Sequence, residues 1–496
     1  MNAAASVAPQ HPRRTLILGC GSVAQCVLPL LIRDFKFDPR SITIVDFRDN
    51  RARVAEQLRF GVTYEQERIT RDNLDSFLSD QLSSGDMLLD LAWNIDCPTI
   101  LEWCRDRGVR YLNTSVELWD PYIDTANTPP ADRTLYVRHQ AIRRMIQRWG
   151  SNTGPSAVVE HGANPGMVSH LAKQALSDIA RRLLADDKAG ARVKDFESAL
   201  ADNEFNKLAM LTGTKVIHIS ERDTQITNQP KRTNEFCNTW SVEGFYEEGI
   251  APAEMGWGTH ERWMPNNAHS HNDDGPRNQI CLAQPGMETW VRTWVPSGET
   301  LGMVIRHGEA YTMSNHLTVW NADGTAAYRP TVHYAYHPAD VAINSVLELR
   351  MRNWEMQPDE RILNDEIIDG RDELGVLLLG HDYTGWWTGS LLSIHEARKI
   401  LPGQSATTMQ VAGSVVAAVQ WLIDSPNEGV CVPDDLPWQK LLADMGPYVG
   451  KIHSEPVDWT PLTARNDLFP RFGNDTSLID QVDPWQFANF LAPTPR

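Results

Sequence analysis

The chain has 496 residues, of which 42% are hydrophobic and 22% are charged, and its formal net charge is −18. This length and composition indicate a globular protein of two or three domains. The negative charge disfavours nucleic acid and anionic membranes as partners, and no apolar run approaches the roughly 20 residues of a membrane span.

The cysteine count and the N-terminus predict a protein of the cytoplasm. The seven cysteines are scattered and form no Cys-x-x-Cys pair, so we expect neither a zinc site nor a disulfide framework. Residues 1–14 lack the apolar core of a secretory signal. The 17 tryptophans are unusual beside 11 tyrosines and 13 phenylalanines. The acidic charge is compatible with a cationic substrate, although charge alone favours a surface that only keeps the protein soluble. The π face of Trp attracts ammonium groups.

A strand, a glycine turn and a helix are predicted at the start of the chain. The apolar run Thr15–Leu18 ends at Gly19, Gly21 follows two residues later, and a helix is expected over Ser22–Phe35. Such a turn lets the backbone approach a pyrophosphate, whose charge the N-terminus of the next helix stabilises. Pro29 inside that helix is a feature against the pattern, since it removes a hydrogen bond.

Asp46 ends the next apolar strand, Ser41–Asp46. A carboxylate at this position accepts hydrogen bonds from the hydroxyls of the adenosine ribose and repels a 2′-phosphate. The pattern therefore favours NAD over NADP.

Strands and helices alternate as far as residue 113, which predicts a doubly wound parallel sheet. Ligands of such sheets bind beyond the carboxyl ends of the strands, so Asn94, Asn113, Thr114 and Glu117 are candidate site residues. The expected elements after Asp46 are helices Arg51–Phe60, Asn73–Leu82 and Pro98–Arg107 and strands Met87–Leu91 and Arg110–Leu112.

A second turn that points to a ligand follows the expected strand Ala157–Glu160, where Gly162–Gly166 leads into a long helix over Met167–Leu184. A basic amphipathic helix, Arg133–Trp149, precedes that strand. Asn164 in the turn either points at a ligand or caps the helix, and the sequence leaves both readings open.

From about Lys194 the alternation ends, and a mixed, largely antiparallel second domain is expected. Thr407–Ile423 reads as an apolar helix that returns to the first domain. We predict a nucleotide-binding domain over residues 13–165 with 400–430, a substrate and dimerisation domain over 166–399, and an extended tail over 431–496. The expected strands include Val216–Ser220, Thr239–Val242, Glu288–Trp294, Met303–Arg306, Leu317–Val319 and Val332–Ala335.

Two polar stretches of the second domain are expected to be solvated. Residues 266–276 contain His269, His271 and Asp273, but no regular element holds them, so a loop is favoured over a metal site. The carboxylate-dense stretch Asp365–Gly375 is expected to be a turn.

The segment Phe236–Trp263 interleaves six aromatic residues, Trp240 among them, with five glutamates, Glu248 among them, and has Arg262 as its one arginine. Carboxylates beside aromatic faces suit an alkyl diammonium ligand, although core aromatics with solvated glutamates give the same pattern. Two further candidates each have a common structural explanation: Glu221 is a site carboxylate or, as is usual in such a run, a partner of Arg222. His307 is a proton relay or, more commonly, a structural histidine.

With these residues in hand, the chain resembles the bacterial homospermidine synthases, a family of the saccharopine dehydrogenase-like Rossmann group. The resemblance runs from about Arg14 to Phe490. It rests on Gly-x-Gly-Ser at Gly19–Ser22, Gly-Ala-Asn-Pro-Gly-Met-Val-Ser at Gly162–Ser169, Glu-Arg-Asp-Thr at Glu221–Thr224, Asn-Thr-Trp-Ser-Val-Glu-Gly-Phe at Asn238–Phe245, Gly-Trp-Gly-Thr at Gly256–Thr259, His-Tyr-Ala-Tyr-His-Pro at His333–Pro338, Asp-Glu-Leu-Gly-Val-Leu-Leu at Asp372–Leu378 and Asp-Trp-Thr-Pro-Leu at Asp458–Leu462.

The resemblance implies NAD-dependent aminobutyl transfer, in which two putrescines give homospermidine and ammonia, carried out by a cytoplasmic homodimer. Asn94 stands where the family has an aspartate, a difference expected to affect cation binding or diamine choice. The implied catalytic positions are Glu117, Asn164, Glu221, Trp240, Glu248 and His307, and the predicted cofactor contacts are Gly19, Gly21, Ser22, Val23, Asp46, Asn94, Thr114 and Asn164.

Two other functions stay open at the level of sequence. A saccharopine- or carboxyspermidine-type dehydrogenase shares the fold, consumes NAD(P)H stoichiometrically and needs cations to bind an amino-acid carboxylate. A regulator that binds NAD without catalysis is the non-enzymatic alternative.

Overall fold

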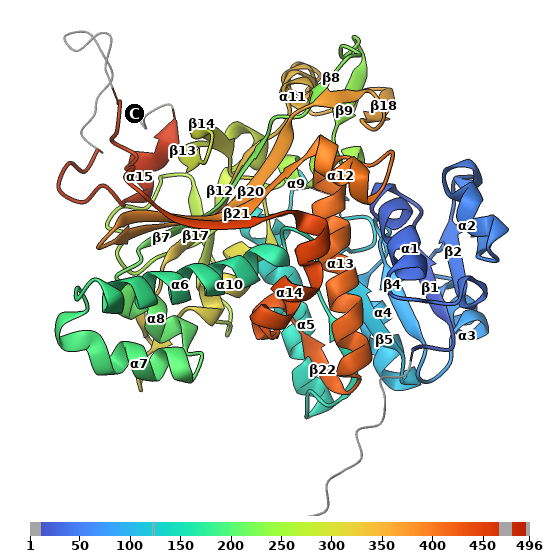
Figure 1. Ribbon diagram of the computed structural model, residues 1–496, viewed down its shortest axis with the longest axis horizontal. Coiled ribbons are helices and arrows are strands. Elements are labelled where there is room, and N and C mark those ends of the chain that lie inside the picture. Colours follow the sequence, from blue (N-terminus) through green and yellow to red (C-terminus); the bar gives the residue numbers. More distant parts are fainter. Residues whose placement is uncertain (1–10, 122, 124, 466–478, 493–496) are drawn as a thin grey trace, which may run out of the picture. The chain divides into compact units, whose positions relative to one another are not determined.

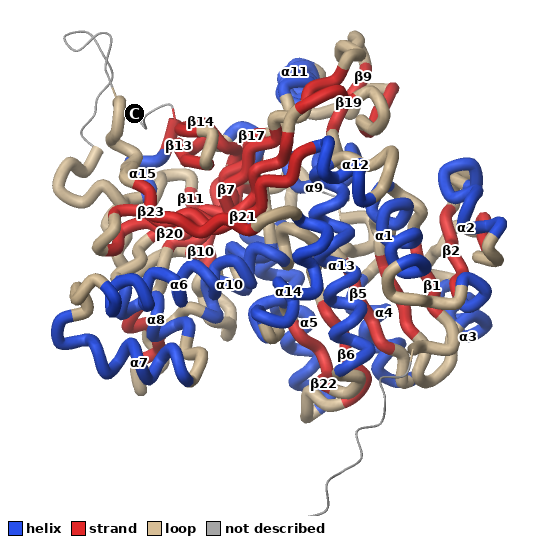
Figure 2. Tube along the Cα trace, viewed as in Figure 1, coloured by secondary structure: helices blue, strands red, loops and turns tan. Residues whose placement is uncertain are grey.

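The computed structural model describes residues 11–121, 123, 125–465 and 479–492, and this part of the chain forms two compact units. Of the described residues, the first unit takes those within Met1–Ile123, His139–Met167 and Thr408–Tyr448. The second takes those within Asp124–Arg138, Val168–Thr407 and Val449–Arg496. Each unit is built around a large sheet, whose strands are red in Figure 2.

The sheet of the first unit has seven strands in the order β22-β6-β5-β4-β1-β2-β3, all paired in parallel (Figure 1). The chain builds outward from β1 and then returns to β4, so the strand order reverses between β1 and β4, where sheets of this kind bind ligands. The strands are β1 (Thr15–Leu18), β2 (Ile42–Asp46), β3 (Thr63–Gln66), β4 (Met87–Asp90), β5 (Arg110–Asn113), β6 (Gly154–Val158) and β22 (Glu428–Cys431).

Most connections between these strands are helical, as the alternating sequence predicts. Helix α1 continues through Pro29 and ends at Arg33, two residues earlier than expected. Strand β3 was not expected, because its residues Thr-Tyr-Glu-Gln are half exposed at the sheet edge and carry no apolar pattern. The helices are α1 (Ser22–Arg33), α2 (Ala55–Arg59), α3 (Leu74–Gln81), α4 (Cys97–Arg107), α5 (Leu135–Trp149), α13 (Ala406–Asp424) and α14 (Trp438–Val449).

Helix α13 is long and apolar enough to cross a membrane by those two measures alone. However, 89% of its apolar window is buried inside the molecule, as in the core helix of a globular unit. Its close packing is consistent with the small residues Ala412, Ala417 and Ala418, which are all fully buried.

The second unit contains an eleven-stranded, largely antiparallel sheet. Its main path is β11-β12-β10-β17-β7-β20-β21-β23, in which β17 and β7 are parallel. The strands of this sheet are β7 (Val216–Asp223), β10 (Pro252–Gly256), β11 (Ala268–Ser270), β12 (Gln279–Pro285), β13 (Trp290–Val295), β14 (Gly298–Met303), β17 (Thr331–His337), β20 (Arg371–His381), β21 (Thr384–Ser393), β23 (Ile452–Val457) and β24 (Leu491–Ala492).

Helices and three small ribbons complete the second unit. Helix α6 contacts the large sheet where Asp178 accepts a hydrogen bond of 2.7 Å from Ser454 of β23. The ribbons pair β15 (Val319–Trp320) with β16 (Ala326–Tyr328), β9 (Glu235–Asn238) with β18 (Asp359–Ile362), and β8 (Ile226–Thr227) with β19 (Ile367–Asp369). The helices are α6 (Met167–Ala185), α7 (Val193–Ala201), α8 (Phe205–Thr212), α9 (Val242–Ile250), α10 (Thr312–His316), α11 (Asp340–Met351), α12 (Ile394–Ile400) and α15 (Phe487–Phe490).

Several local predictions after residue 194 are wrong. The strand expected over Met303–Arg306 is absent, because β14 ends at Met303, and the loop expected over 266–276 contains strand β11. The strand expected over Thr239–Val242 is absent, because the side chain of Ser241 accepts the Gly244 N–H at 3.0 Å and begins helix α9. The stretch Asp365–Gly375 is not a solvated turn, since Asp372 and Glu373 are fully buried in β20. Residues 438–457 form helix α14 and strand β23 rather than an extended tail.

Candidate functional site

The glycine turn after β1 can be made only by glycine at its first position. Gly19 has a φ of +86°, and a Cβ there would lie 2.6 Å from the carbonyl oxygen of Leu91. Its N–H donates to the carbonyl of Val45 at 2.8 Å, which fixes the turn against β2. The backbone therefore passes between two strand ends without a side chain in the way.

The N-terminus of α1 is open. Among the residues that the structure describes, a Cβ added to Gly21, the N-cap residue, would meet no atom within 4 Å, and no side chain caps the helix. Ser22 and Val23 begin the helix, so their N–H groups belong to the first turn and lack carbonyl partners within the helix. Open space, unpaired amides and the positive end of the helix dipole fit a pyrophosphate.

Asp46 has a second role that its position in the sequence does not reveal. Its Oδ2 accepts the N–H of Cys20 at 2.7 Å, and its Oδ1 accepts the N–H of Arg48 at 2.8 Å. The carboxylate thus ties the glycine turn to the end of β2. Oδ2 also accepts the side-chain amide of Asn50 at 3.4 Å, which leaves Oδ1 to accept a ribose hydroxyl with its second lone pair.

The other predicted residues of this unit lie beyond β4, β5 and β6. Asn94 has a φ of +58°, and its buried Oδ1 has no hydrogen-bond partner among the described residues. Glu117 is buried and accepts the Ser115 hydroxyl at 2.6 Å. Asn164 lies in a turn closed by the Gly162 N–H, which donates to Pro165 at 2.6 Å. Thr114 borders the same turn, because a Cβ on Gly162 would lie 3.7 Å from its Cγ2.

Sequence reasoning singled out Asn113 but missed the buried polar chain to which it belongs, at the same edge of the sheet. The Tyr111 hydroxyl donates to Asp90 at 2.9 Å, Asn113 donates to Tyr111 at 3.0 Å, and Asn113 accepts the N–H of Glu160 at 2.7 Å. Glu160 in turn lies 2.7 Å from His139. Burial raises the pKa of Asp90 to about 7, so the edge carries a carboxyl group that titrates near neutral pH.

In the second unit, three buried carboxylates share one face of the sheet. Glu221 and Asp223 are two residues apart on β7, and Asp372 on β20 stands opposite Asp223. Thr407 donates to Asp372 at 2.5 Å, and Thr239 donates to Asp223 at 2.5 Å. Burial, followed by the neighbouring Glu221 and Asp223, raises the pKa of Asp372 well above its usual value.

Aromatic rings adjoin these carboxylates. Tyr334 and Tyr336 of β17 stack with centroids 5.3 Å apart and an interplanar angle of 9°. The Tyr334 hydroxyl donates to Glu221, and the Trp240 indole N–H donates to the Tyr336 hydroxyl at 3.1 Å. The tyrosine pair therefore connects Glu221 with Trp240.

His307 and Glu248 lie on the same network. The His307 ring meets Tyr334 edge to face at 4.3 Å, and its Nε2 lies 3.9 Å from a carboxylate oxygen of Glu248. Glu221, Trp240, Glu248 and His307, which are far apart in sequence, are thus brought together around Tyr334 and Tyr336. Carboxylates and aromatic faces in this arrangement compensate cationic ends and contact a methylene chain.

Other candidate residues lie elsewhere. His271 is buried, stacks on Tyr136 at 3.8 Å and lies 2.9 Å from Gln279, whereas His269 is exposed on β11. Within the described residues, no group of three or more His, Cys, Asp or Glu side chains is placed to hold a metal. Arg262 forms ion pairs with Asp480 at 3.1 Å and with Asp483 at 2.9 Å.

Comparison with known proteins gives the family. Residues 15–158 match the saccharopine dehydrogenase NADP-binding domain, and residues 162–455 match the saccharopine dehydrogenase C-terminal domain. Homospermidine synthases from Mesorhizobium japonicum and Blastochloris viridis are 40% and 41% identical over 483 and 481 residues, covering 96% of this chain and of each relative. The chain belongs to the homospermidine synthase family.

A solved structure agrees with this assignment. The homospermidine synthase of Legionella pneumophila, crystallised in complex with NAD, is 36% identical and superposes with a TM-score of 0.84 over 97% of this chain and 98% of its own. The fold predicted from the sequence, a Rossmann-type parallel sheet followed by a largely antiparallel unit, is thereby confirmed.

The face formed by strands β7, β17 and β20 carries four further residues of the candidate site that were not predicted from the sequence. Asp223, Tyr334, Tyr336 and Asp372 lie beside the predicted residues, yet none was singled out. The available signal was the alternation Glu221-x-Asp223 and Tyr334-x-Tyr336, which places both residues of each pair on one face of a strand. The roles of the individual site residues stay predictions.

Proposed function

We propose that this chain catalyses NAD-dependent transfer of an aminobutyl group from one putrescine to another, which forms homospermidine and releases ammonia. The observation that carries the proposal is the buried face on which Glu221, Asp223 and Asp372 adjoin Tyr334 and Tyr336. A face with three buried carboxyl groups and this much aromatic surface suits a flexible dication better than an amino-acid carboxylate.

The first unit is proposed to hold the cofactor. The open N-terminus of α1, the turn at Gly19 and the carboxylate of Asp46 fit a dinucleotide without a 2′-phosphate. The unpartnered Oδ1 of Asn94 is a buried acceptor that a bound group would satisfy. When bound, NAD supplies a hydride acceptor and later a hydride donor, so the overall reaction is redox neutral.

The second unit is proposed to bind the diamine. Glu221 and Glu248 compensate the ammonium ends, and the ring of Trp240 lies along the methylene chain and orients it. An amine with a pKa near 10 must lose a proton at the reacting carbon's end, and His307 accepts that proton. The amine of the second putrescine then attacks the reacting carbon and forms the new C–N bond. The original C–N bond at that carbon breaks, and its nitrogen leaves as ammonia.

We also propose that the protein works as a homodimer in the cytoplasm, which rests on the family resemblance. The predicted domain roles, nucleotide binding before residue 165 and diamine binding and dimerisation after it, remain part of this proposal. Light scattering after size-exclusion chromatography tests the dimer, since a mass of one chain contradicts it.

The deciding experiment incubates the purified protein with putrescine and a trace of NAD. We expect one homospermidine and one ammonia for every two putrescines, without accumulation of NADH. A dehydrogenase of the saccharopine or carboxyspermidine type would instead consume NAD(P)H stoichiometrically, and an NAD-binding regulator would leave putrescine unchanged.

Trp240 provides a test of the diamine site. Trp240→Ala removes the ring and is expected to lower kcat/KM for putrescine about 30-fold, the effect of losing a desolvated cation–π contact worth about 2 kcal/mol. Trp240→Phe keeps a ring and is expected to lose less, and Trp320→Ala, at an exposed tryptophan, is the control. Retention of activity within a few-fold in Trp240→Ala contradicts the role.

A further inference from the structure

A buried charge cluster lies directly behind His307 and Glu248. Glu247, the neighbour of Glu248 on α9, accepts a hydrogen bond of 3.0 Å from Arg138 and a second one from Arg306. The exposed fraction of the side chain is 6% for Arg138, 2% for Glu247 and 5% for Arg306. One carboxylate oxygen thus holds two guanidiniums in a place where water screens little of their charge.

The cluster is linked to the proposed diamine site residue by residue. Arg306 precedes His307, as Glu247 precedes Glu248, so two adjacent pairs connect α9 with the segment after β14. The backbone N–H of Arg306 also donates to the carbonyl of Glu248 at 3.4 Å. A movement of Glu247 relative to Arg306 would therefore change the 3.9 Å distance between His307 Nε2 and the Glu248 carboxylate.

The cluster also decides which sign of charge lies next to the site. Two arginines beside a diamine site would repel an ammonium and attract a carboxylate, unless an acid neutralises them. Buried Glu254 lies close enough for Arg306 and Arg138 to lower its pKa, but burial is the larger effect and brings that pKa to about 7. Glu247 contacts both guanidiniums directly and offsets one of their two positive charges.

We propose that Glu247 is a positioning residue that sets the charge preference of the diamine site. It holds Arg138 and Arg306 so that the part of the site beside Glu248 and His307 accepts an ammonium end of the diamine. This inference rests on the proposed function, because it concerns the same diamine site. Glu247 is not proposed to contact the substrate. It acts through Arg138 and Arg306, which it contacts.

Two substitutions separate charge from simple structural support. Glu247→Gln keeps an acceptor oxygen for Arg138 but removes the negative charge of the cluster, whereas Arg138→Met removes the contact together with one positive charge. We expect KM for putrescine to rise about tenfold in Glu247→Gln and to stay level or fall in Arg138→Met, with kcat changed less than KM in both. Glu247→Asp keeps the charge and is expected to restore most of the affinity.

A carboxylate-ended competitor gives an independent measurement. 4-Aminobutyrate has the length of putrescine with one terminal aminomethyl group replaced by a carboxylate, and we expect it to inhibit Glu247→Gln several-fold more strongly than the unchanged protein. Melting temperature and NAD affinity, measured for every variant, identify those that fail to fold. If Glu247→Gln does not fold, Arg138→Met and Glu247→Asp still test the sign of the charge effect.

The outcomes distinguish this inference from the proposed function. Shifts of KM in the same direction in Glu247→Gln and Arg138→Met, or no shift in either, overturn the charge role while homospermidine is still formed. If the unchanged protein forms no homospermidine, the proposed function fails. In that event, calorimetric titration of the NAD-loaded protein with putrescine still tests the inference, and equal affinities in the two variants overturn it.

Discussion

Asp46 illustrates how one side chain carries both structure and specificity. Because both of its oxygens accept backbone N–H groups, at Cys20 and at Arg48, its loss would disturb the glycine turn as well as the ribose contact. A substitution that keeps an acceptor oxygen separates the two effects.

We expect Asp46→Asn to reduce the preference for NAD over NADP about tenfold. The amide oxygen still accepts the Cys20 N–H, while the negative charge that repels a 2′-phosphate is gone. Calorimetric titration with each dinucleotide measures the change, and Asp49→Asn, at an exposed aspartate paired with Arg51, is the control. An unchanged ratio of the two affinities contradicts the predicted role of Asp46.

Asp90 is expected to make the stability of the protein depend on pH. Its pKa is raised from 3.8 to about 7 in the folded protein, so between these values only the unfolded chain gives up the proton. The stability that Asp90 contributes is complete below pH 3.8 and is lost as the pH rises to about 7, by up to about 4 kcal/mol.

Asp90→Asn removes this titration and keeps an oxygen that accepts the Tyr111 hydroxyl. The difference in Tm between the variant and the unchanged protein is therefore expected to shift in favour of the variant from pH 4.5 to pH 7.5. Scanning calorimetry at both pH values provides the measurement. A difference that stays constant with pH means that Asp90 does not titrate in this range.

At the scale of elements, the sequence predicts the strands, turns and helices that depend on residues adjacent in the chain. The apolar run of β1 and the glycine turn after it can be read from neighbouring residues. Which residue faces which across the second sheet cannot, because Asp372 meets Asp223 only through the pairing of β20 with β7, far away in the chain. A dense run of carboxylates looks solvated until that register is known.

Helix α9 shows the same limit in the opposite direction. The segment around Trp240 contains four glycines between Phe236 and Trp263 and several aromatic residues, which favour a loop or a strand by propensity. The cap at Ser241 and the packing of Phe245 against Tyr336, at 5.6 Å, stabilise a helix instead. Tertiary contacts thus override weak local preference.

We expect Ser241→Ala to destabilise α9 by about 1 kcal/mol, the usual cost of losing an N-cap hydrogen bond. Since Trp240 precedes the cap, KM for putrescine is expected to rise along with the loss of stability. Urea unfolding and steady-state kinetics measure the two effects, and Ser241→Asp, which keeps a capping oxygen, is the matched control. Equal stability of the Ala and Asp variants contradicts the capping role.

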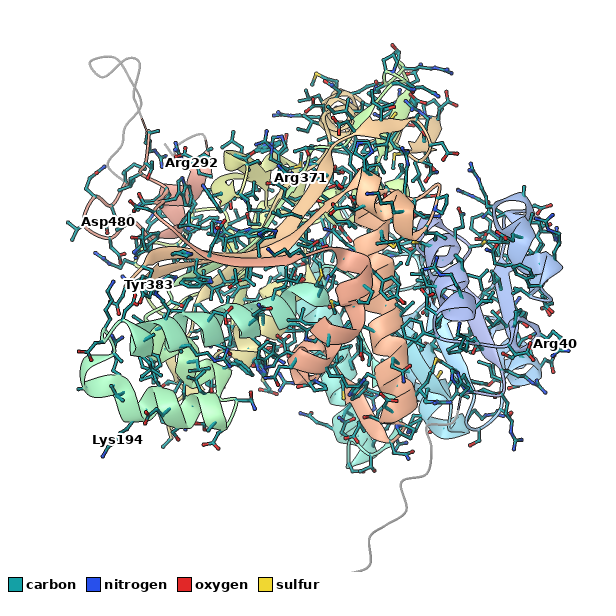
Figure 3. The ribbon with its side chains drawn as sticks, in the orientation of Figure 1. Arg40, Lys194, Arg292, Arg371, Tyr383 and Asp480 are labelled. Carbon is teal, nitrogen blue, oxygen red and sulfur yellow. The ribbon has the colours of Figure 1, made fainter. Side chains whose placement is uncertain are left out.

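At the scale of the whole molecule, the net charge of −18 is a property of the surface as well as of the site. Charged side chains such as Arg40, Lys194 and Asp480 project outward in Figure 3. Acidic groups outnumber basic ones by 64 to 46, so the field around the protein attracts a dication over distances that exceed direct contact.

We expect kcat/KM for putrescine to fall as salt is added, because ions screen this attraction beyond about 8 Å at physiological ionic strength. Initial rates across a series of sodium chloride concentrations measure the slope. The affinity for NAD, an anion, serves as the comparison and is expected to strengthen or stay level. A kcat/KM for putrescine that does not change with salt contradicts long-range attraction.

The place of β22 in the first sheet constrains how the protein can be made. Strand β6 ends at Val158, whereas its neighbour β22 begins only at Glu428, after most of the second unit. On a ribosome that adds about 5–20 residues per second, the edge of β6 waits on the order of tens of seconds for its partner. A nascent chain therefore exposes the unpaired edge of β6 throughout that interval. An exposed strand edge can pair with other chains, and chaperone binding to the nascent chain would prevent this.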